Sequence, residues 1–450
     1  MTTRSTEPSL SPLVPGLSRR GLLIAAASTA AGTAGLLILP TKAEAATASP
    51  RHGSRPDVVG PWFDEMLATF AAAPTAGLPE RMWAMSWIAA WAALSARRAA
   101  PVRAPGQRAV FEDAATATAV HGVLKALVPG QADKLDGVLA DSLAGLAASE
   151  AKKAGIAAGR EAAAAMVAVR TGDGLDLASV NVPFTLPPEA PGVYRLTPGA
   201  TQTVAAGYGL ARPFLLGRAD RFRPPPPPAL GTAPYRRALD EVRRLGGEVS
   251  ERTEAQSDLA WLDPLSQYVP VLRLLVGDSA RSRRSKVRLL AALGAAIVDS
   301  SIATFEAKYA LLHWRPVTAI RDADTDGDPR TAPDPTWNSF LPTPPHPEYP
   351  SGHAVTAGAA EQVLSQLVGP CTPMAFSITF ARGDGRVVTR NYRRGTPWST
   401  LTKENIDARV LAGVHFRYSD EVGAALGRQV ARYDLNLLAR GGVGPVRVTW

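Results

Sequence analysis

VRLLAALGAAIVDSSIATFEAKYALLHWRP, residues 287–316, repeats apolar residues at the three- and four-residue spacing of an α-helix. Pro316 lacks a backbone donor and fixes φ, so we expect a helix over residues 287–314 that ends at this proline. The same periodicity recurs in four further segments, which are residues 234–245, 259–275, 353–367 and 405–438. A chain with this pattern is expected to have an all-α fold.

The sequence N-terminal to this stretch is also helical in pattern. Residues 56–170 are rich in alanine, and Trp83, Trp87 and Trp91 recur every four residues, which places them on one helix face. A row of tryptophans could serve as a stacking platform, but packing into the core is the interpretation we favour. We therefore expect an N-terminal group of helices, each with one buried face.

A proline-rich segment separates the two helical parts. Residues 171–235 are weakly periodic and include RFRPPPPPAL at 221–230, where proline removes backbone donors and favours extended structure. Helical patterns resume over residues 236–440. The expected architecture is one large helical domain built from two helix bundles, with the Pro-rich extended segment wrapped over them.

Composition limits the function classes. The chain has 450 residues, 46% of them hydrophobic, which is enough for a large core. Lysine and arginine number 49 against 40 acidic residues, a net charge of +9. This excess is spread out, so it favours anions in general and does not indicate nucleic acid. The single cysteine, Cys371, excludes an intrachain disulfide and a cysteine-based zinc site.

The first 46 residues have the features of a twin-arginine signal peptide. Arg19 and Arg20 precede the apolar stretch GLLIAAASTAAGTAGLLILP, and the small residues Ala43, Ala45 and Ala46 offer an A-x-A cleavage site. The alternative is a retained membrane anchor, because about 20 apolar residues can span a bilayer. We find no later run long and apolar enough to span one. The expected product is a soluble protein, exported to the periplasm or beyond, with no stable membrane insertion.

Three short motifs in the C-terminal half carry chemistry. The first is KYALLHWRP at 308–316, where Lys308 and Arg315 lie seven residues apart. Seven residues are nearly two helical turns, so both side chains are expected on one face of the predicted helix. Two such cations repel each other unless they hold an anion together or meet carboxylates.

The second motif is PPHPEYPSGHAVTAG at 344–358. Ser351, Gly352 and His353 follow a proline and open a predicted helix, whose first amides and positive dipole end favour an anion. Ser351 adds a hydroxyl, Gly352 allows close approach to the backbone, and His353 can act as a general acid or base. A simple serine-capped helix start is the alternative interpretation.

The third motif is ARVLAGVHFRYSDE at 408–421, with Arg409 and His415 six residues apart. Six residues turn an unbroken helix through about 600°, so the two side chains would not share a face. Either Gly413 marks an irregularity, or the two residues hold an anion from different sides. An imidazole beside several cations has a depressed pKa, so His415 is expected to be neutral and available as a ligand or nucleophile.

Taken together, the motifs resemble a known superfamily. Their order and spacing, Lys-x6-Arg-Pro, then Pro-Ser-Gly-His, then Arg-x5-His, are similar to those of the vanadium-dependent haloperoxidases and the type 2 phosphatidic acid phosphatases. The resemblance is clearest over residues 299–438. The Pro-rich middle also looks like that of exported bacterial haloperoxidases.

The resemblance implies a role for each motif residue. A tetrahedral oxyanion would be held by the set Lys308, Arg315, Ser351, Gly352 and Arg409. In a haloperoxidase the oxyanion is vanadate, His415 binds the vanadium, and His353 assists proton transfer while hydrogen peroxide oxidises a halide that then reacts with a small organic substrate. In an acid phosphatase His415 attacks the phosphorus of a phosphomonoester and His353 protonates the leaving group.

Two departures from the phosphatase pattern favour the haloperoxidase. Ala408 stands where phosphatases usually have serine, and Ser419 stands where they have an aspartate four residues after the histidine; Asp420 comes one place later, so we doubt that it orients His415. His346 matches a position near the metal that haloperoxidases fill with an aromatic residue or a histidine. It is a candidate for the halide site, with a surface loop histidine as the alternative.

Three functional hypotheses remain open from the sequence. The leading one is a vanadium-dependent haloperoxidase, the second is an acid phosphatase with a phosphohistidine intermediate, and the third is a non-catalytic exported oxyanion binder. A homodimer is possible under each. The sequence does not identify a carboxylate partner for His353.

The stretch DADTDGDP, residues 322–329, begins like a calcium-binding loop. Its twelfth position is Pro333 rather than the glutamate that such loops need. We interpret the stretch as an acidic turn.

Overall fold

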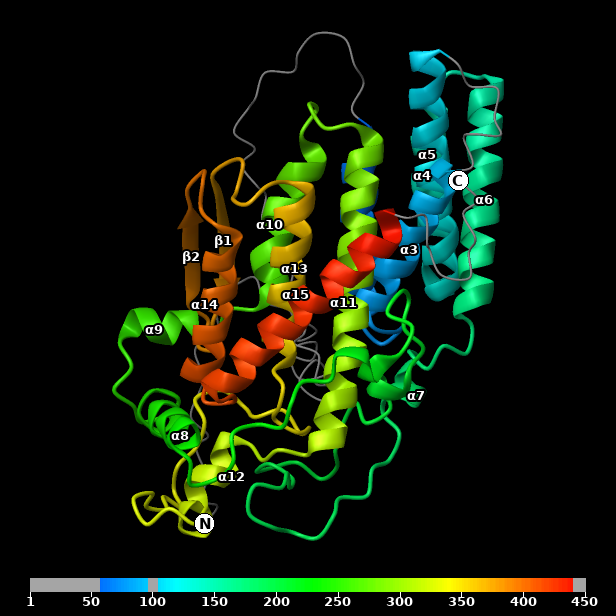
Figure 1. Cartoon of the computed structure of the whole chain (residues 1–450). Helices are drawn as coiled ribbons and strands as arrows, with labels where there is room; N and C mark the ends of the chain where they lie inside the picture. Colours follow the sequence, from blue (N-terminus) through cyan, green and yellow to red (C-terminus); the bar gives the residue numbers. More distant parts are fainter. Residues whose placement is uncertain (1–56, 96–103, 440–450) are drawn as a thin grey trace, which may run out of the picture.

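The computed structural model describes residues 57–95 and 104–439, and helices dominate them (Figure 1). The expected all-α fold is confirmed. The expected signal peptide, residues 1–46, lies outside the described residues.

The N-terminal part consists of helices that pack side by side, with α4 against both α3 and α6. These helices are α2 (Val59–Ala72), α3 (Pro79–Ser95), α4 (Pro105–Leu127), α5 (Ala132–Ala144, after the 3-10 turn η2, Pro129–Gln131) and α6 (Glu150–Arg170). Trp83, Trp87 and Trp91 of α3 are at most 6% exposed, which confirms that they belong to the core. Gly155 lets α6 approach α4 closely, because a Cβ there would lie 2.6 Å from the Phe111 carbonyl oxygen.

Helix α11 (Arg283–Leu311) lies at the centre of the molecule (Figure 1). It packs against α3 on the N-terminal side and against α13 and α15 on the C-terminal side. Contrary to our expectation from the sequence, α11 is long and apolar enough to cross a membrane, the one such helix among the described residues. However, 89% of its apolar window is buried inside the protein, as in the core helix of a soluble protein.

The C-terminal part surrounds the far side of α11. Its helices are α8 (Ala233–Leu245), α9 (Glu254–Leu259), α10 (Pro264–Gly277), α12 (Pro316–Arg321, followed by the 3-10 turn η5, Ala323–Thr325), α13 (Gly352–Leu367), α14 (Trp398–Leu411) and α15 (Arg417–Ala439). A two-stranded antiparallel hairpin, β1 (Phe376–Ala381) and β2 (Val387–Tyr392), was not predicted. Its β1 residues alternate between buried and more exposed, as a half-buried strand requires.

The Pro-rich segment contains only short helical turns, α7 (Leu177–Val180), η3 (Tyr208–Leu210) and η4 (Ala219–Phe222). It runs over the lower part of α11 in the view of Figure 1. Asp299 of α11 fixes it by accepting hydrogen bonds from three successive backbone amides, those of Phe214, Leu215 and Leu216, at 2.6 to 2.8 Å. A buried carboxylate therefore satisfies donors that an extended segment would otherwise leave unpaired.

Candidate functional site

We predicted that Lys308 and Arg315 share one helix face, and this prediction is wrong. Helix α11 ends at Leu311, and Leu312 adopts a left-handed conformation with φ 47° that turns the chain away from the helix axis. Arg315 then caps the N-terminus of α12, in which Pro316 is the first residue. Pro316 therefore starts a helix rather than ending one, because a first-turn proline loses no helical hydrogen bond.

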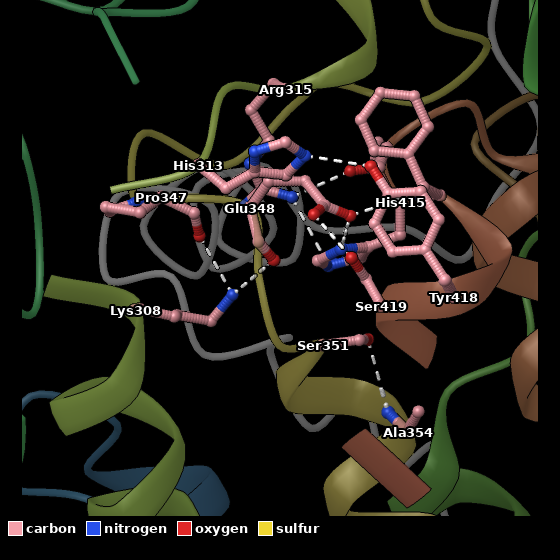
Figure 2. A network of polar contacts seen from close by, with 12 residues as sticks. Lys308, His313, Arg315, Pro347, Glu348, Ser351, Ala354, His415, Tyr418 and Ser419 are labelled. Carbon is pink, nitrogen blue, oxygen red and sulfur yellow. Dashed lines mark hydrogen bonds and ion pairs between the residues drawn. The ribbon is translucent and has the colours of Figure 1, made fainter. Parts of the chain in front are cut away.

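Both cations nevertheless reach the same buried place. The Lys308 ammonium donates to the carbonyl oxygens of Pro347 and Glu348 at 2.9 and 2.8 Å (Figure 2). The Arg315 guanidinium donates to the carbonyl oxygens of His346 and Val414 at 2.9 and 2.7 Å. Both side chains are fully buried. Burial lowers the pKa of Lys308 well below its usual value, and the charge of Arg315 lowers it further. These contacts bring the first motif against both of the others.

The second motif forms the N-terminus of α13. The Ser351 hydroxyl caps the helix by accepting from the Ala354 amide at 3.4 Å, as the simpler interpretation of this motif expected. Gly352 is the first helical residue, and a Cβ there would meet no atom within 4 Å. The first amides of the helix have no preceding turn to bond to. The space beside Gly352 is therefore open at an end of the helix that favours an anion.

Arg409 and His415 lie on either side of Gly413, Arg409 in the last turn of α14 and His415 in the turn that leads to α15. The predicted helix over residues 405–438 is interrupted at Gly413, whose φ of 78° confirms the irregularity. Arg409, in the last turn of α14, is 7% exposed, and its Nε atom has no hydrogen-bond partner within the described residues. A buried guanidinium with an unused donor is suited to an anion.

His415 is buried and neutral. Its Nε2 lies 3.3 Å from the Arg315 guanidinium, and its Nδ1 lies 2.8 Å from the Glu348 carboxylate. Burial is the main cause that lowers the pKa of His415 well below its usual value, and the charges of Arg315 and Lys308 lower it further. The predicted direction of the shift is confirmed, but the sequence argument named only the smaller cause.

Glu348 is one of two carboxyl residues of the site that the sequence analysis missed. It is fully buried, and besides the His415 ring its carboxylate accepts from the Phe416 amide at 2.9 Å and the Ser419 hydroxyl at 2.5 Å (Figure 2). Burial raises the pKa of Glu348 to about 7. Asp420 is buried as well, and burial raises the pKa of its carboxyl well above the usual value, but its hydrogen-bonding neighbour is Ser351 and not His415. The carboxylate on His415 is therefore Glu348, 67 residues earlier in the chain.

His353 faces a carboxylate that the sequence did not identify. Its Nε2 lies 3.8 Å from the Asp263 carboxylate, and both side chains are less than a fifth exposed. Asp263 also caps α10 by accepting from the Leu265 and Ser266 amides. Burial lowers the pKa of His353 well below its usual value and raises that of Asp263 to about 6. His353 is therefore a neutral imidazole that lies close to a buried carboxyl group.

A cleft of about 90 Å³ opens onto these histidines. Its lining includes Phe305, His346, Gly352, His353 and His415. His346 is 4% exposed, so it is not a surface loop histidine. Its Nδ1 lies 3.0 Å from the Arg315 guanidinium, and its ring packs edge-on against Phe305 at 5.2 Å. The halide-site candidate thus lies beside the cation cluster.

The acidic turn at residues 322–329 does not join this site. Thr331 donates to the Asp326 carboxylate at 2.8 Å, and Arg236 and Arg330 neutralise Asp328. Within residues 57–95 and 104–439, no group of three His, Cys, Asp or Glu side chains is placed to hold a metal ion. A metal that is bound as an oxyanion needs no such group, because the oxyanion is negatively charged and is held by cations rather than by carboxylates.

The site therefore has the features of an oxyanion pocket. Three cations converge on one imidazole, the Arg409 Nε donor is unused, and a helix N-terminus opens onto free space at Gly352. Burial in a medium of low polarity strengthens every charge interaction here. A tetrahedral or trigonal-bipyramidal oxyanion carries the negative charge and the acceptors that this arrangement lacks.

Comparisons with known proteins match the part of the chain that carries these residues. Residues 288–440 match the family model of the VCPO second helical-bundle domain. The vanadium chloroperoxidase of Curvularia inaequalis is 36% identical over 87 residues, which are 17% of this chain and 14% of that protein.

Two solved structures share the fold over most of this chain. A bacterial vanadium-dependent iodoperoxidase aligns with a TM-score of 0.63 and 19% identity, covering 85% of this chain and 98% of its own. An apo-type bacterial vanadium-dependent chloroperoxidase aligns with a TM-score of 0.61 and 18% identity, covering 88% and 96%. Residues 288–440 therefore match the VCPO second helical-bundle domain, and most of the chain shares its fold with the two bacterial vanadium-dependent haloperoxidases.

Proposed function

We propose that the protein is a vanadium-dependent haloperoxidase that oxidises halide with hydrogen peroxide at a vanadate bound to His415. The observation that carries the proposal is the state of His415. Its ring is buried and neutral, one nitrogen is fixed by Glu348, and the other is directed to the cation cluster. A neutral imidazole nitrogen among cations suits a ligand bond to an anionic metal oxide.

The residues present fit vanadate. Lys308, Arg315 and Arg409 would neutralise its oxygens, and the Arg409 Nε is a donor without a partner in the described residues. Gly352 would contribute its amide, because it opens α13 and the first amides of a helix have no preceding turn to bond to. Bound vanadate would supply a Lewis-acidic centre that activates peroxide toward halide, while the vanadium keeps its oxidation state. The charge cluster is the protein's own contribution, and it holds the group without a cage of ligands.

His353 is the residue we propose for proton transfer. It lines the cleft, and burial keeps it neutral, so Nδ1 or Nε2 can accept a proton from peroxide as it enters. Asp263, 3.8 Å away, is placed to stabilise the imidazolium that results. His346, beside Arg315 at the wall of the same cleft, is the proposed halide contact.

The partners follow from this chemistry. Hydrogen peroxide, a halide and a small organic acceptor are the proposed substrates, and a homodimer is a possible assembly. We propose export by the twin-arginine route to the periplasm or beyond, which carries folded proteins and suits a chain with one cysteine. Cleavage at the end of residues 1–46, detected by mass spectrometry of the secreted protein, would test this part.

The direct test is bromination of a cyclic diketone by the purified mature protein with orthovanadate, bromide and hydrogen peroxide. Vanadate-dependent turnover that disappears in His415→Ala is the expected result. Arg428→Ala, on the surface of α15, is the matched control and should retain it. Phosphate release from a phosphomonoester without vanadium would instead support the acid phosphatase, and vanadate binding without either activity would support the oxyanion binder.

A further inference from the structure

Glu348 has no role in any of the motif assignments, although it makes three of the shortest contacts of the site. Its carboxylate is 0% exposed and accepts from the Phe416 amide and the Ser419 hydroxyl while it contacts His415 Nδ1. Its own backbone carbonyl accepts from Lys308. Glu348 thus joins the residues of all three motifs.

The two contacts of the His415 ring determine which nitrogen carries the proton. An arginine has only donors, so at 3.3 Å the Arg315 guanidinium requires an acceptor at Nε2. The Glu348 oxygen that lies 2.8 Å from Nδ1 already accepts from the Phe416 amide, as a carboxylate oxygen does. Both sides of the ring therefore favour Nδ1–H with a bare Nε2.

A bare Nε2 is the atom that a metal or a phosphorus centre needs. Ser419 follows the histidine by four residues. The Ser419 hydroxyl contributes, because it donates to the second Glu348 oxygen at 2.5 Å and so fixes the carboxylate in place (Figure 2). Glu348 and Ser419 together therefore hold the ring from its Nδ1 side.

We infer that Glu348 is the positioning residue of the site: it holds His415 in the Nδ1–H form, with Ser419 fixing Glu348 in turn, so that Nε2 stays free to bind the oxyanion's central atom. The effect of Glu348 on oxyanion binding rests on the proposed function, but the protonation of the His415 ring can be measured without any ligand. Partners that orient a metal-binding histidine typically change metal affinity tenfold to a hundredfold when removed.

The first experiment is nitrogen NMR of the mature chain with labelled histidine, without vanadate or peroxide. The His415 signals, assigned with His415→Ala, should show a protonated Nδ1 and an unprotonated Nε2. Glu348→Met keeps the length of the side chain and removes the acceptor, so it should mix the two forms or invert them. A wild-type ring protonated at Nε2, or an unchanged ring in Glu348→Met, would overturn the inference.

The second experiment is titration of the same proteins with orthovanadate, and with inorganic phosphate as a second probe. Glu348→Met should weaken vanadate binding about tenfold to a hundredfold. Glu251→Met, an exposed glutamate that pairs with Arg244, is the control and should bind as the wild type does. Equal affinities in Glu348→Met and the control would count against a positioning role.

A relocated carboxylate distinguishes positioning from simple stability. The double variant Glu348→Ala with Ser419→Asp moves the carboxylate from residue 348 to residue 419, its partner in the Ser419–Glu348 hydrogen bond. This variant should recover the Nδ1–H form of His415 and much of the lost vanadate affinity. Failure to recover either would refute the role. If Glu348→Met does not fold, Ser419→Ala tests the same link and should weaken vanadate binding severalfold. If the wild type binds no vanadate, the proposed function fails, while the NMR result still decides the role of Glu348.

Discussion

Replacing Asp263 by Asn measures how much the ionisation of this buried carboxyl beside His353 lowers the free energy of unfolding. Asparagine caps a helix as well as aspartate does, so the hydrogen bonds from the Leu265 and Ser266 amides should survive and only the ionisation is removed. Burial raises the pKa of Asp263 to about 6 from an ordinary 3.8. At about 1.4 kcal/mol per pH unit, this difference corresponds to about 3 kcal/mol.

The direction of the pH dependence follows from whether the folded or the unfolded state binds the proton of Asp263 more tightly. The folded pKa lies above the unfolded one, so the stabilising contribution is complete below about pH 4 and is lost as the pH rises through about 6. The unfolding free energy of the wild type, measured relative to Asp263→Asn, should therefore fall by about 3 kcal/mol between pH 3.5 and pH 7.

The assay is urea unfolding of both proteins at half-unit steps over this pH range. Asp176→Asn is the matched control, because Asp176 also caps a helix but is exposed, and its hydrogen bonds with Ser179 lower the pKa of its carboxyl. Its pH dependence should have the opposite sign, with wild-type stability relative to the variant rising with pH. Stability curves of the wild type and Asp263→Asn that run parallel over the whole range would refute the reasoning.

Three further changes test other parts of the molecule. Arg409→Met removes a cation whose Nε donor is unused, and calorimetric titration should show about tenfold to a hundredfold weaker vanadate binding; unchanged binding would place the oxyanion elsewhere. Asp434→Asn removes a fully buried carboxyl that has no hydrogen-bond partner in the described residues, and burial raises the pKa of this carboxyl well above its usual value. In denaturant unfolding, the variant should therefore gain stability over the wild type by about 1.4 kcal/mol per pH unit above about pH 4. A stability difference that does not change with pH would contradict this. Trp87→Ala empties a fully buried position in α3 and should cost about 3 to 5 kcal/mol of unfolding free energy by the same measurement; a cost below 1 kcal/mol would mean that the core collapses into the space.

Local patterns carried much of the fold. The helical periodicity around residues 287–314 identified the central helix, and the tryptophan spacing identified α3, because one buried face repeats with the period of the helix. The hairpin β1–β2 was missed because its two strands are six residues each, too short for periodicity to separate them from a loop. The break at Leu312 was missed because nothing in that residue type requires a left-handed conformation.

By itself, the sequence determined the helical class and the residue types of the site, because spacing and composition act over a few turns of chain. The tertiary structure alone decided how these residues meet. Lys308 and Arg315 converge through a turn rather than along one helix face, and Glu348 reaches His415 across 67 residues. A contact of that separation leaves no periodic trace in the chain, since the packing of α11, α13 and α15 creates it and no local preference encodes it.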